Sequence, residues 1–470
     1  MRHLALLLLA AAPLALPSAS ARAAEHELSV GFGEVDVTPE LGKKAVFLAG
    51  FGHNRLATKV HDPIMARAVV LSDGTHKVAL VSVDVVGLFF PSVEKVRKQL
   101  PGFKYVLVSS THNHEGPDTL GLWGKTPFQS GIDAEYLKRV EDGAAKAVLL
   151  ADKALKPAAA KIGTAKGPEL LHDGRKPEVK HDDLVAVRFE PRDGSKPLGV
   201  LVQWNCHPET LDDTNTEVSA DYVHYTVKHL ADAHGCPVAY FTGTVGGLLT
   251  SLRVPVKDDA GRELKDGTFE KTERYGRLVG QLADRALAAA TPVTLTPFGV
   301  RTRAVLMPVE NPLYRLAAGT GVLNRAMYSY DGDPAPKEFT ETKDLTKSVA
   351  VKTELGYLKL GELEVAAIPG EIYPELVLGG VQDPIDPGAD YPDAPVEPAI
   401  YTQLKGKHRM LIGLANDELG YFVPKRQWDE KAPFCYGLKK AQYGEVNSVG
   451  PEAAPIICSV FKNLVAGESP

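Results

Sequence analysis

The sequence predicts an α/β fold with a mixed, largely parallel central sheet and helices on both faces. Two observations lead to this prediction. Short continuous apolar runs, such as Val78–Val83 and Gly199–Trp204, are typical of strands covered on both sides. Amphipathic segments with helical periodicity alternate with these runs, as Ser219–Gly235 does.

The first residues predict an exported protein. A charged start at Arg2 is followed by the apolar run Leu4–Leu16 and by small residues at Ala21 and Ala23. We therefore expect a signal peptide over residues 1–23 and a secreted or periplasmic location after its cleavage. No later run reaches the roughly 18 apolar residues of a membrane span, so no transmembrane segment is expected. Removing Arg2 and Arg22 changes the formal charge from −6 to −8, which argues against a nucleic-acid partner.

Residues 24–470 are expected to form a single domain. Their length would allow two or three domains, but no Ser/Gly-rich linker or repeat divides them. Four cysteines are too few for a disulfide framework. Cys206 and Cys236 are expected at opposite edges of the sheet, so Cys435 with Cys458 is the more plausible disulfide.

The N-terminal part is predicted to contain a βαβ unit. Strands are expected at Leu28–Thr38, Ala45–Gly50 and Met65–Leu71, where Gly, Pro and Asp separate apolar runs. The buried-type strand Val78–Val83 comes next. Ser92 then begins a short amphipathic helix, which leads back into a strand at Tyr105.

Helices and strands continue to alternate in the rest of the chain. Asp133 can cap a long helix, and the helix Ser219–Gly235 lies between the strands Gly199–Trp204 and Pro237–Phe241. Further elements are expected near Thr272–Ala290 (helix), Val300–Pro308 and Ser348–Ile368 (strands), Met410–Leu414 (strand) and Pro451–Val465 (helix). Residues 309–347 show no readable pattern. The proline-rich and acidic segment Ile385–Ala399 is expected as a surface loop that could serve as a lid.

A histidine pair follows the strand that begins at Tyr105. If this strand continues through Thr111, its alternation places His112 and His114 on one side. Neutral imidazole is a common zinc ligand, so two imidazoles facing one point suggest a metal site. The alternative is two surface histidines at a turn. Zinc would also need donors from elsewhere in the chain.

Three other turns carry such donors. His207 ends the strand that begins at Gly199 and is stopped by Pro208, Glu371 follows a Pro-Gly turn, and Tyr421 lies in a polar loop after Met410–Leu414. Each could be ordinary turn chemistry. Together they would complete a metal site at the carboxyl ends of the strands, where open α/β sheets place ligands.

Several motifs, in this order, resemble the neutral ceramidase family. They are Val35-Asp-Val-Thr-Pro39, His61-Asp-Pro63, Ala66-Arg-Ala68, Thr111-His-Asn-His-Glu-Gly-Pro117, Asn205-Cys-His-Pro208, Ser219-Ala-Asp221, Ile368-Pro-Gly-Glu371 and Gly413-Leu-Ala-Asn416 with Gly420-Tyr421. The resemblance extends from about Glu27 to Val465. It implies one zinc ion per chain, held by four ligands: His112, His207, Glu371 and Tyr421. It also implies that His114 lies beside the zinc and that Arg175 contacts the substrate carbonyl.

The chain departs from the family in ways that bear on the substrate. The segment 422–436 lacks the tyrosine-rich pattern that lines the family's site. Glu115 replaces a small residue, and Gly243-Thr-Val-Gly-Gly-Leu248 lacks an aspartate. No C-terminal immunoglobulin-like domain is expected, because the chain ends five residues after the last predicted helix.

The expected function is that of an exported zinc-dependent amidohydrolase. It would cleave the N-acyl bond of a ceramide-like or other N-acyl lipid with a metal-activated water. Glu371 or His114 would accept a proton, His114 would return one to the amine, and Arg175 would stabilise the oxyanion. A zinc-dependent esterase or phosphoesterase and a non-catalytic metal- or lipid-binding protein are the alternatives. A lipid-like small molecule is the expected partner, with peripheral membrane contact allowed and the oligomeric state open.

The sequence lacks the motifs that are typical of several other enzyme classes. The chain has no Gly-x-Ser-x-Gly elbow, no His-Glu-x-x-His helix and no phosphate-binding loop.

Overall fold

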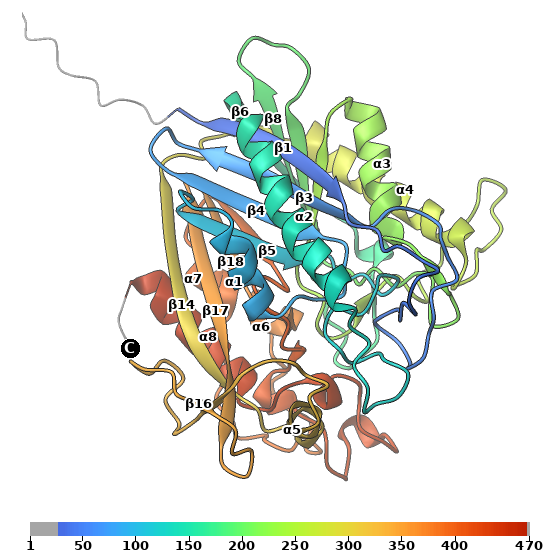
Figure 1. Ribbon diagram of the computed structural model, residues 1–470, viewed down its shortest axis with the longest axis vertical. Helices are drawn as coiled ribbons and strands as arrows, with labels where there is room; N and C mark the ends of the chain where they lie inside the picture. The colour runs from blue at the N-terminus through green and yellow to red at the C-terminus, as the bar shows by residue number, and fades with distance from the viewer. Residues whose placement is uncertain (1–26, 468–470) are drawn as a thin grey trace, which may run out of the picture.

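The computed structural model describes residues 27–467 and confirms the α/β class (Figure 1). The predicted signal peptide, residues 1–23, lies outside the described residues. Among the helices that are described, none combines the length and apolarity that crossing a membrane requires.

The strands and helices have the following bounds. The strands are β1 (Ser29–Asp36), β2 (Lys59–Val60), β3 (Met65–Ser72), β4 (Lys77–Val83), β5 (Tyr105–Ser110), β6 (Lys156–Lys166), β7 (His172–Asp173), β8 (Asp183–Pro191), β9 (Gly199–Trp204), β10 (Glu217–Val218), β11 (Val238–Thr242), β12 (Leu249–Thr250), β13 (Thr291–Val293), β14 (Phe298–Pro308), β15 (Met327–Ser329), β16 (Glu341–Thr342), β17 (Val349–Leu360), β18 (Leu363–Ala367), β19 (Glu371–Ile372), β20 (His408–Ile412) and β21 (Tyr421–Phe422). The α-helices are α1 (Phe90–Lys98), α2 (Ala134–Lys153), α3 (Tyr222–His234), α4 (Phe269–Ala288), α5 (Pro312–Gly319), α6 (Pro374–Leu378), α7 (Ile400–Gln403) and α8 (Ala453–Ala466).

One strand order occurs three times along the chain. The first unit contains β1, β3, β4 and β5, the second β6, β8, β9 and β11, and the third β14, β17, β18 and β20. In each unit the first two pairings are antiparallel and the last is parallel. The prediction of a mixed sheet is confirmed, and that of a largely parallel one only in part, because one pairing in three within each unit is parallel.

The helices repeat in the same way. α1, α3 and the pair α6 and α7 connect the parallel strands of the first, second and third units. The helix that follows each parallel pair, α2, α4 or α8, packs on the first two strands of its own unit. The predicted βαβ unit is confirmed. The predicted cap of α2 is confirmed too, because the Asp133 side chain accepts a hydrogen bond from the Glu135 N–H. The predicted end of α3 at Gly235 is also confirmed, and this glycine has a φ of 63°.

Each unit has an outer core between its sheet and its helices, and a fourth core lies among the three units. In β3, for example, Ala68 and Val70 face the core that contains α2, whereas Val69 and Leu71 face the central core. The helices thus cover one face of each sheet, not both as predicted. The apolar runs are continuous because the other face packs against the neighbouring units.

The three units meet where their parallel pairs end. Thr242 Oγ1, at the end of β11, donates to the Thr111 carbonyl at 2.7 Å, and the Gly413 N–H, after β20, donates to the Thr242 carbonyl at 3.0 Å. Ser109 Oγ in β5 then donates to the Gly413 carbonyl at 2.9 Å. These bonds close a ring of contacts, so the carboxyl ends of strands from all three units face one place.

Other elements differ from the predictions. Residues 45–50 form only isolated bridges, β6 and β8 were not predicted, and residues 309–347 contain α5, β15 and β16. The predicted disulfide is also wrong: Cys435 and Cys458 are free, buried thiols. Cys458 lies within α8, whereas Cys435 begins the short 3₁₀ helix Cys435–Gly437, and its N–H donates to Asp429.

Candidate metal centre

His112 leaves β5 through a left-handed turn. The strand ends at Ser110, and His112 has a φ of 67° while its N–H donates to the Val85 carbonyl at 3.1 Å. The expected continuation of the strand through Thr111 is therefore wrong. The turn nevertheless brings the rings of His112 and His114 together, with centroids 4.9 Å apart.

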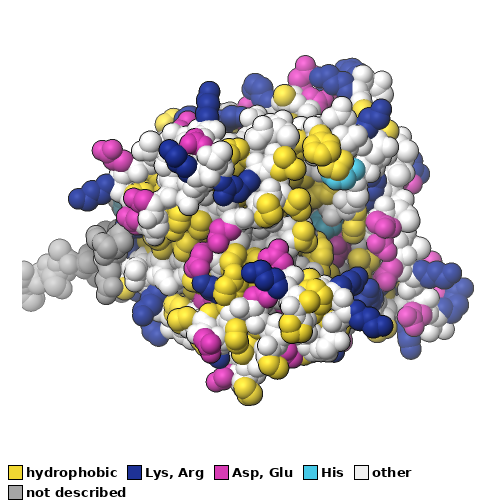
Figure 2. All heavy atoms as spheres, turned by 90° about the horizontal axis from the view of Figure 1, so that it is seen from below, with side chains coloured by type: hydrophobic (Ala, Val, Ile, Leu, Met, Phe, Trp, Pro, Cys, Tyr) yellow, Lys and Arg dark blue, Asp and Glu magenta, His cyan; other side chains and the backbone are white. Residues whose placement is uncertain are grey.

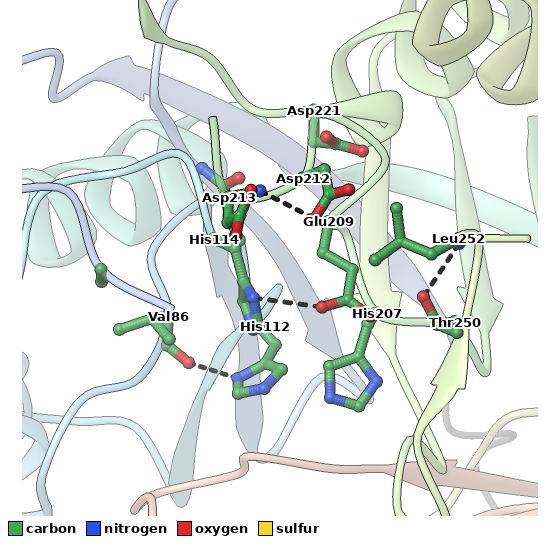
Figure 3. A network of polar contacts seen from close by, with 12 residues as sticks. Val86, His112, His114, His207, Glu209, Asp212, Asp213, Asp221, Thr250 and Leu252 are labelled. Carbon is green, nitrogen blue, oxygen red and sulfur yellow. Dashed lines mark hydrogen bonds and ion pairs between the residues drawn. The ribbon is translucent and has the colours of Figure 1, made fainter. Parts of the chain in front are cut away.

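His112 and His207 are both held by backbone carbonyls. His112 Nδ1 lies 2.7 Å from the Val86 carbonyl, and His207 Nδ1 lies 2.8 Å from the Leu249 carbonyl (Figure 3 shows the first of these bonds). Because a carbonyl oxygen can only accept, each Nδ1 must carry the hydrogen. In the neutral ring Nε2 then offers a lone pair, as in metal-ligating histidines.

Glu371 and Tyr421 reach the same point from the third unit. Glu371 in β19 and Tyr421 in β21 are direct partners in a short parallel pair. Glu371 Oε2 lies 3.3 Å from His112 Nε2 and 3.0 Å from His207 Nε2, and Tyr421 Oη lies 3.2 Å from His207 Nε2. All four predicted ligands are buried.

The chemistry of this donor set fits a metal ion. The Nε2 atoms of two imidazoles and a carboxylate oxygen face one another, and no hydrogen lies between them to form a bond. A cation bound at this point would be attracted to the lone pairs of all three atoms. Nitrogen and oxygen donors are those that zinc takes in catalytic sites. Within residues 27–467, nitrogens of His112, His114 and His207 also lie within 4.8 Å of one another, so this group could bind a metal.

His114 lies beside the four ligands and faces a carboxylate. Its Nδ1 is 3.3 Å from Glu209 Oε2, and a dashed line marks this contact in Figure 3. Burial and the neighbouring His112 and His207 hold the pKa of His114 well below its usual range. The sequence analysis missed Glu209. A carboxylate two residues after His207 was the signal that could have found it.

A buried ion pair supports His114 from outside. Arg55 Nη1 lies 3.0 Å from Glu115 Oε2, and Arg55 Nη2 donates to the carbonyl oxygens of Ala49 and His114. The unusual Glu115 is therefore the counter-ion of Arg55. Gly50, with a φ of 93°, leaves the space for His114, because a Cβ there would lie 2.3 Å from His114 Cγ.

Arg175 does not reach the ligands. Its guanidinium is buried and contacts both carboxylate oxygens of Glu445, at 2.6 and 2.7 Å. It also donates to the carbonyl oxygens of Tyr443 at 2.9 Å and Gln427 at 2.8 Å. Since these acceptors occupy the guanidinium and Arg175 does not line the cavity beside the ligands, the structure does not bring it to the expected substrate carbonyl.

A cavity of about 400 Å³ leads to the site. Its wall includes His112, His114, Glu371 and Tyr421, and is otherwise largely apolar. The apolar side chains include Phe51, Phe89, Leu122, Trp123, Leu323 and Met327. Part of this wall comes from residues 309–347, for which the sequence predicted nothing. The predicted lid, residues 385–399, contributes no residue to the wall, so that prediction is wrong.

Comparisons with known proteins show the same fold in neutral ceramidases. The crystal structure of neutral ceramidase from Pseudomonas aeruginosa matches with a TM-score of 0.68 and 16% identity, covering 94% of this chain and 74% of that one. A ceramidase complexed with C2 matches with a TM-score of 0.69 and 17% identity, covering 94% and 75%. No family model and no curated protein matches the chain.

Fold and site together define an α/β protein of three repeated units with a buried site that could bind a metal. The particular fold is that of neutral ceramidases, as the motifs led us to expect.

Proposed function

We propose that this chain is a zinc-dependent amidohydrolase that cleaves the N-acyl bond of a ceramide-like or other N-acyl lipid. One observation carries the proposal: His112, His207, Glu371 and Tyr421 converge beside a largely apolar cavity. Such a cavity suits a long apolar chain. The shared fold with neutral ceramidases supports the choice of an amide bond.

These four residues would hold one zinc ion per chain. The ion would polarise the amide carbonyl as a Lewis acid and lower the pKa of a bound water to about 7.

Protons would be moved by His114 and Glu371, two of the titratable side chains that line the cavity. When water adds to the amide carbon and the carbon–nitrogen bond breaks, the water loses a proton and the departing nitrogen gains one. Glu371 or His114 accepts the first; from Glu371 it passes on to His114, and His114, which is not among the four ligands, delivers it to the amine nitrogen. Glu209 orients the His114 ring.

Arg175 acts as a positioning residue in this proposal. Its contacts with Tyr443 and Glu445 hold residues 443–447, and Tyr443 and Asn447 belong to the cavity wall. The role of oxyanion contact is therefore not assigned to Arg175.

A hydrolysis screen of the purified chain tests the proposal. Initial rates for ceramide, simpler N-acyl amines and matched esters are compared with and without a chelator. We expect amide hydrolysis that the chelator abolishes and added Zn²⁺ restores. Turnover of esters without turnover of any N-acyl substrate would instead support the esterase alternative, and the absence of all turnover would support a binding protein.

Export is part of the same proposal and rests on the signal-like residues 1–23. N-terminal sequencing of the protein recovered outside the cytoplasm tests it, with a start at residue 22 or 24 as the expected result.

A further inference from the structure

Exposed apolar side chains gather around the mouth of the cavity. Of twelve large apolar side chains that are exposed in residues 27–467, five lie on three segments that contribute to the cavity wall. They are Phe128 (65% exposed), Leu313 (55%), Leu316 (51%), Val446 (48%) and Tyr443 (45%). We name these segments, residues 122–131, 312–319 and 443–447, the cavity rim. Figure 2 shows hydrophobic side chains around a hollow on the side of the molecule where α5 lies.

The three segments form one continuous structure. Asn311, the cap of α5, donates from Nδ2 to the carbonyl oxygens of Val446 and Ser448, and Tyr314 Oη donates to the Asn447 carbonyl at 2.9 Å. On the other side, a Cβ at Gly121 would lie 2.4 Å from the Val322 carbonyl, so the loop before residue 122 touches the segment after α5. The exposed side chains therefore belong to one surface.

α5 presents apolar side chains to solvent without a partner. None of its residues is buried, and Leu313 and Leu316 are its most exposed large side chains. An exposed apolar patch of this kind, rimming a cavity, marks a surface that contacts something apolar. The cavity behind it is apolar too, so an alkyl chain could pass from the contacted surface into the cavity without entering water.

The charge of the cavity rim indicates what it contacts. Across its three segments, all within the described residues, Lys125 is the only exposed charged side chain. Arg315 is partly buried and donates to the carbonyl oxygens of Leu345 and Lys347, and Glu445 is buried against Arg175. A surface for anionic lipid would need a basic cluster, which the rim lacks.

We infer that the cavity rim docks the enzyme on a zwitterionic lipid surface, from which the substrate's acyl chain enters the cavity. The inference rests on the proposed function for the identity of the substrate. Docking itself depends only on the rim.

Paired variants test the inference. Leu313→Gln with Leu316→Gln removes two apolar side chains from the rim. Leu149→Gln with Leu150→Gln is the matched control, since these two residues are 44% and 40% exposed on α2, outside the rim. Each mature chain is sedimented with phosphatidylcholine vesicles, and its activity is measured on an N-acyl lipid in those vesicles and on a soluble short-chain N-acyl amine.

We expect the rim variant to lose vesicle binding and vesicle-bound turnover by about tenfold or more, because two leucines leave the interface. Turnover of the soluble substrate should stay unchanged, and the control should match the wild type throughout. Equal vesicle binding by the rim variant would overturn the inference. So would a wild-type dimer, seen by size-exclusion chromatography, that the rim variant dissociates without any vesicle binding by either protein.

The outcomes separate this inference from the proposed function. Rim-dependent vesicle binding without hydrolysis of any N-acyl substrate would refute the proposed function and leave the docking surface. Hydrolysis of soluble amides without vesicle binding would do the reverse.

Discussion

The first and third units share one strand order but build different parts of the site. In the first unit, His112 and His114 lie in one tight turn directly after β5, and both are buried. In the third unit, Glu371 and Tyr421 lie on the short strands β19 and β21, and the connection between β14 and β17 adds α5, which carries two of the half-exposed side chains of the cavity rim, Leu313 and Leu316.

In the proposed function, this difference separates the residues that perform the chemistry from those that control substrate access. The repeated strand ends place the donor atoms, because the three units meet there. The connections, which differ between units, shape the cavity and its surroundings. Changes at the strand ends should therefore act on metal content, and changes in the connections should act on stability or on substrate binding.

The largest effect is expected when a proposed metal-ligating side chain is removed from the first or the third unit. His112→Ala and Glu371→Ala should each abolish metal binding, and kcat/KM should fall on the order of 10⁴-fold, since a catalytic metal provides several kcal/mol of transition-state stabilisation. Metal analysis of the purified variants and initial rates provide the measurement. The control is His408→Ala, at the opposite end of β20, which should keep its zinc. Unchanged zinc in both ligand variants would refute the proposed centre.

The next effect concerns stability. Arg175→Met leaves the buried carboxylate of Glu445 without its partner, so the free energy of unfolding should fall by about 3–5 kcal/mol. Denaturant titration measures it. The double variant Arg175→Met/Glu445→Gln should recover part of this loss, because it leaves no unpaired charge.

An exposed ion pair provides the control for the stability effect of Arg175→Met. Lys228→Met removes a surface partner of Asp232 and should change the stability little. A small effect of Arg175→Met, similar to that of Lys228→Met, would show that the Arg175 pair does not hold residues 443–447 in place.

His114→Ala should have the smallest of the three effects. We expect it to keep its zinc while kcat falls by about 10²-fold or more, the usual scale for a general acid or base. Glu209→Gln should lower kcat by only about tenfold, because it acts through the orientation of His114. Loss of zinc from His114→Ala would make this residue a ligand, and retained activity would leave it without a catalytic role.

The sequence predicted that His112, His207 and Glu371 would come together because their signals are local; their role as metal ligands stays a prediction. His112, His207 and Glu371 each follow a buried strand at a turn, and the strands were recognisable from their apolar runs. The threefold repeat was missed because it lies in the pairing of strands, and the three units reach the same pairing with different residues. Continuous apolar runs also look alike whether helices or other sheets cover them.

The other predictions failed because they depend on contacts between residues that lie far apart in the sequence. The resemblance assigned Arg175 to the substrate carbonyl, and no local pattern could reveal its partner Glu445, which lies 270 residues away in the chain. The cavity wall includes residues 309–347, which show neither helical nor strand periodicity over a useful length, since α5 spans only eight residues. Glu115 departs from the small residue of the family motif, and the motif alone does not reveal that Arg55 lies beside it as its counter-ion.

In the proposed function, the bonds that fix His112 and His207 would also couple zinc binding to folding. The Val86 and Leu249 carbonyls aim the two Nε2 atoms only when β5 and β9 are in place, so the complete donor set belongs to the folded chain. By thermodynamic linkage, each tenfold rise of free zinc above its dissociation constant should add about 1.4 kcal/mol to the free energy of unfolding. Melting temperature measured against zinc concentration would then report the affinity of the site without any substrate.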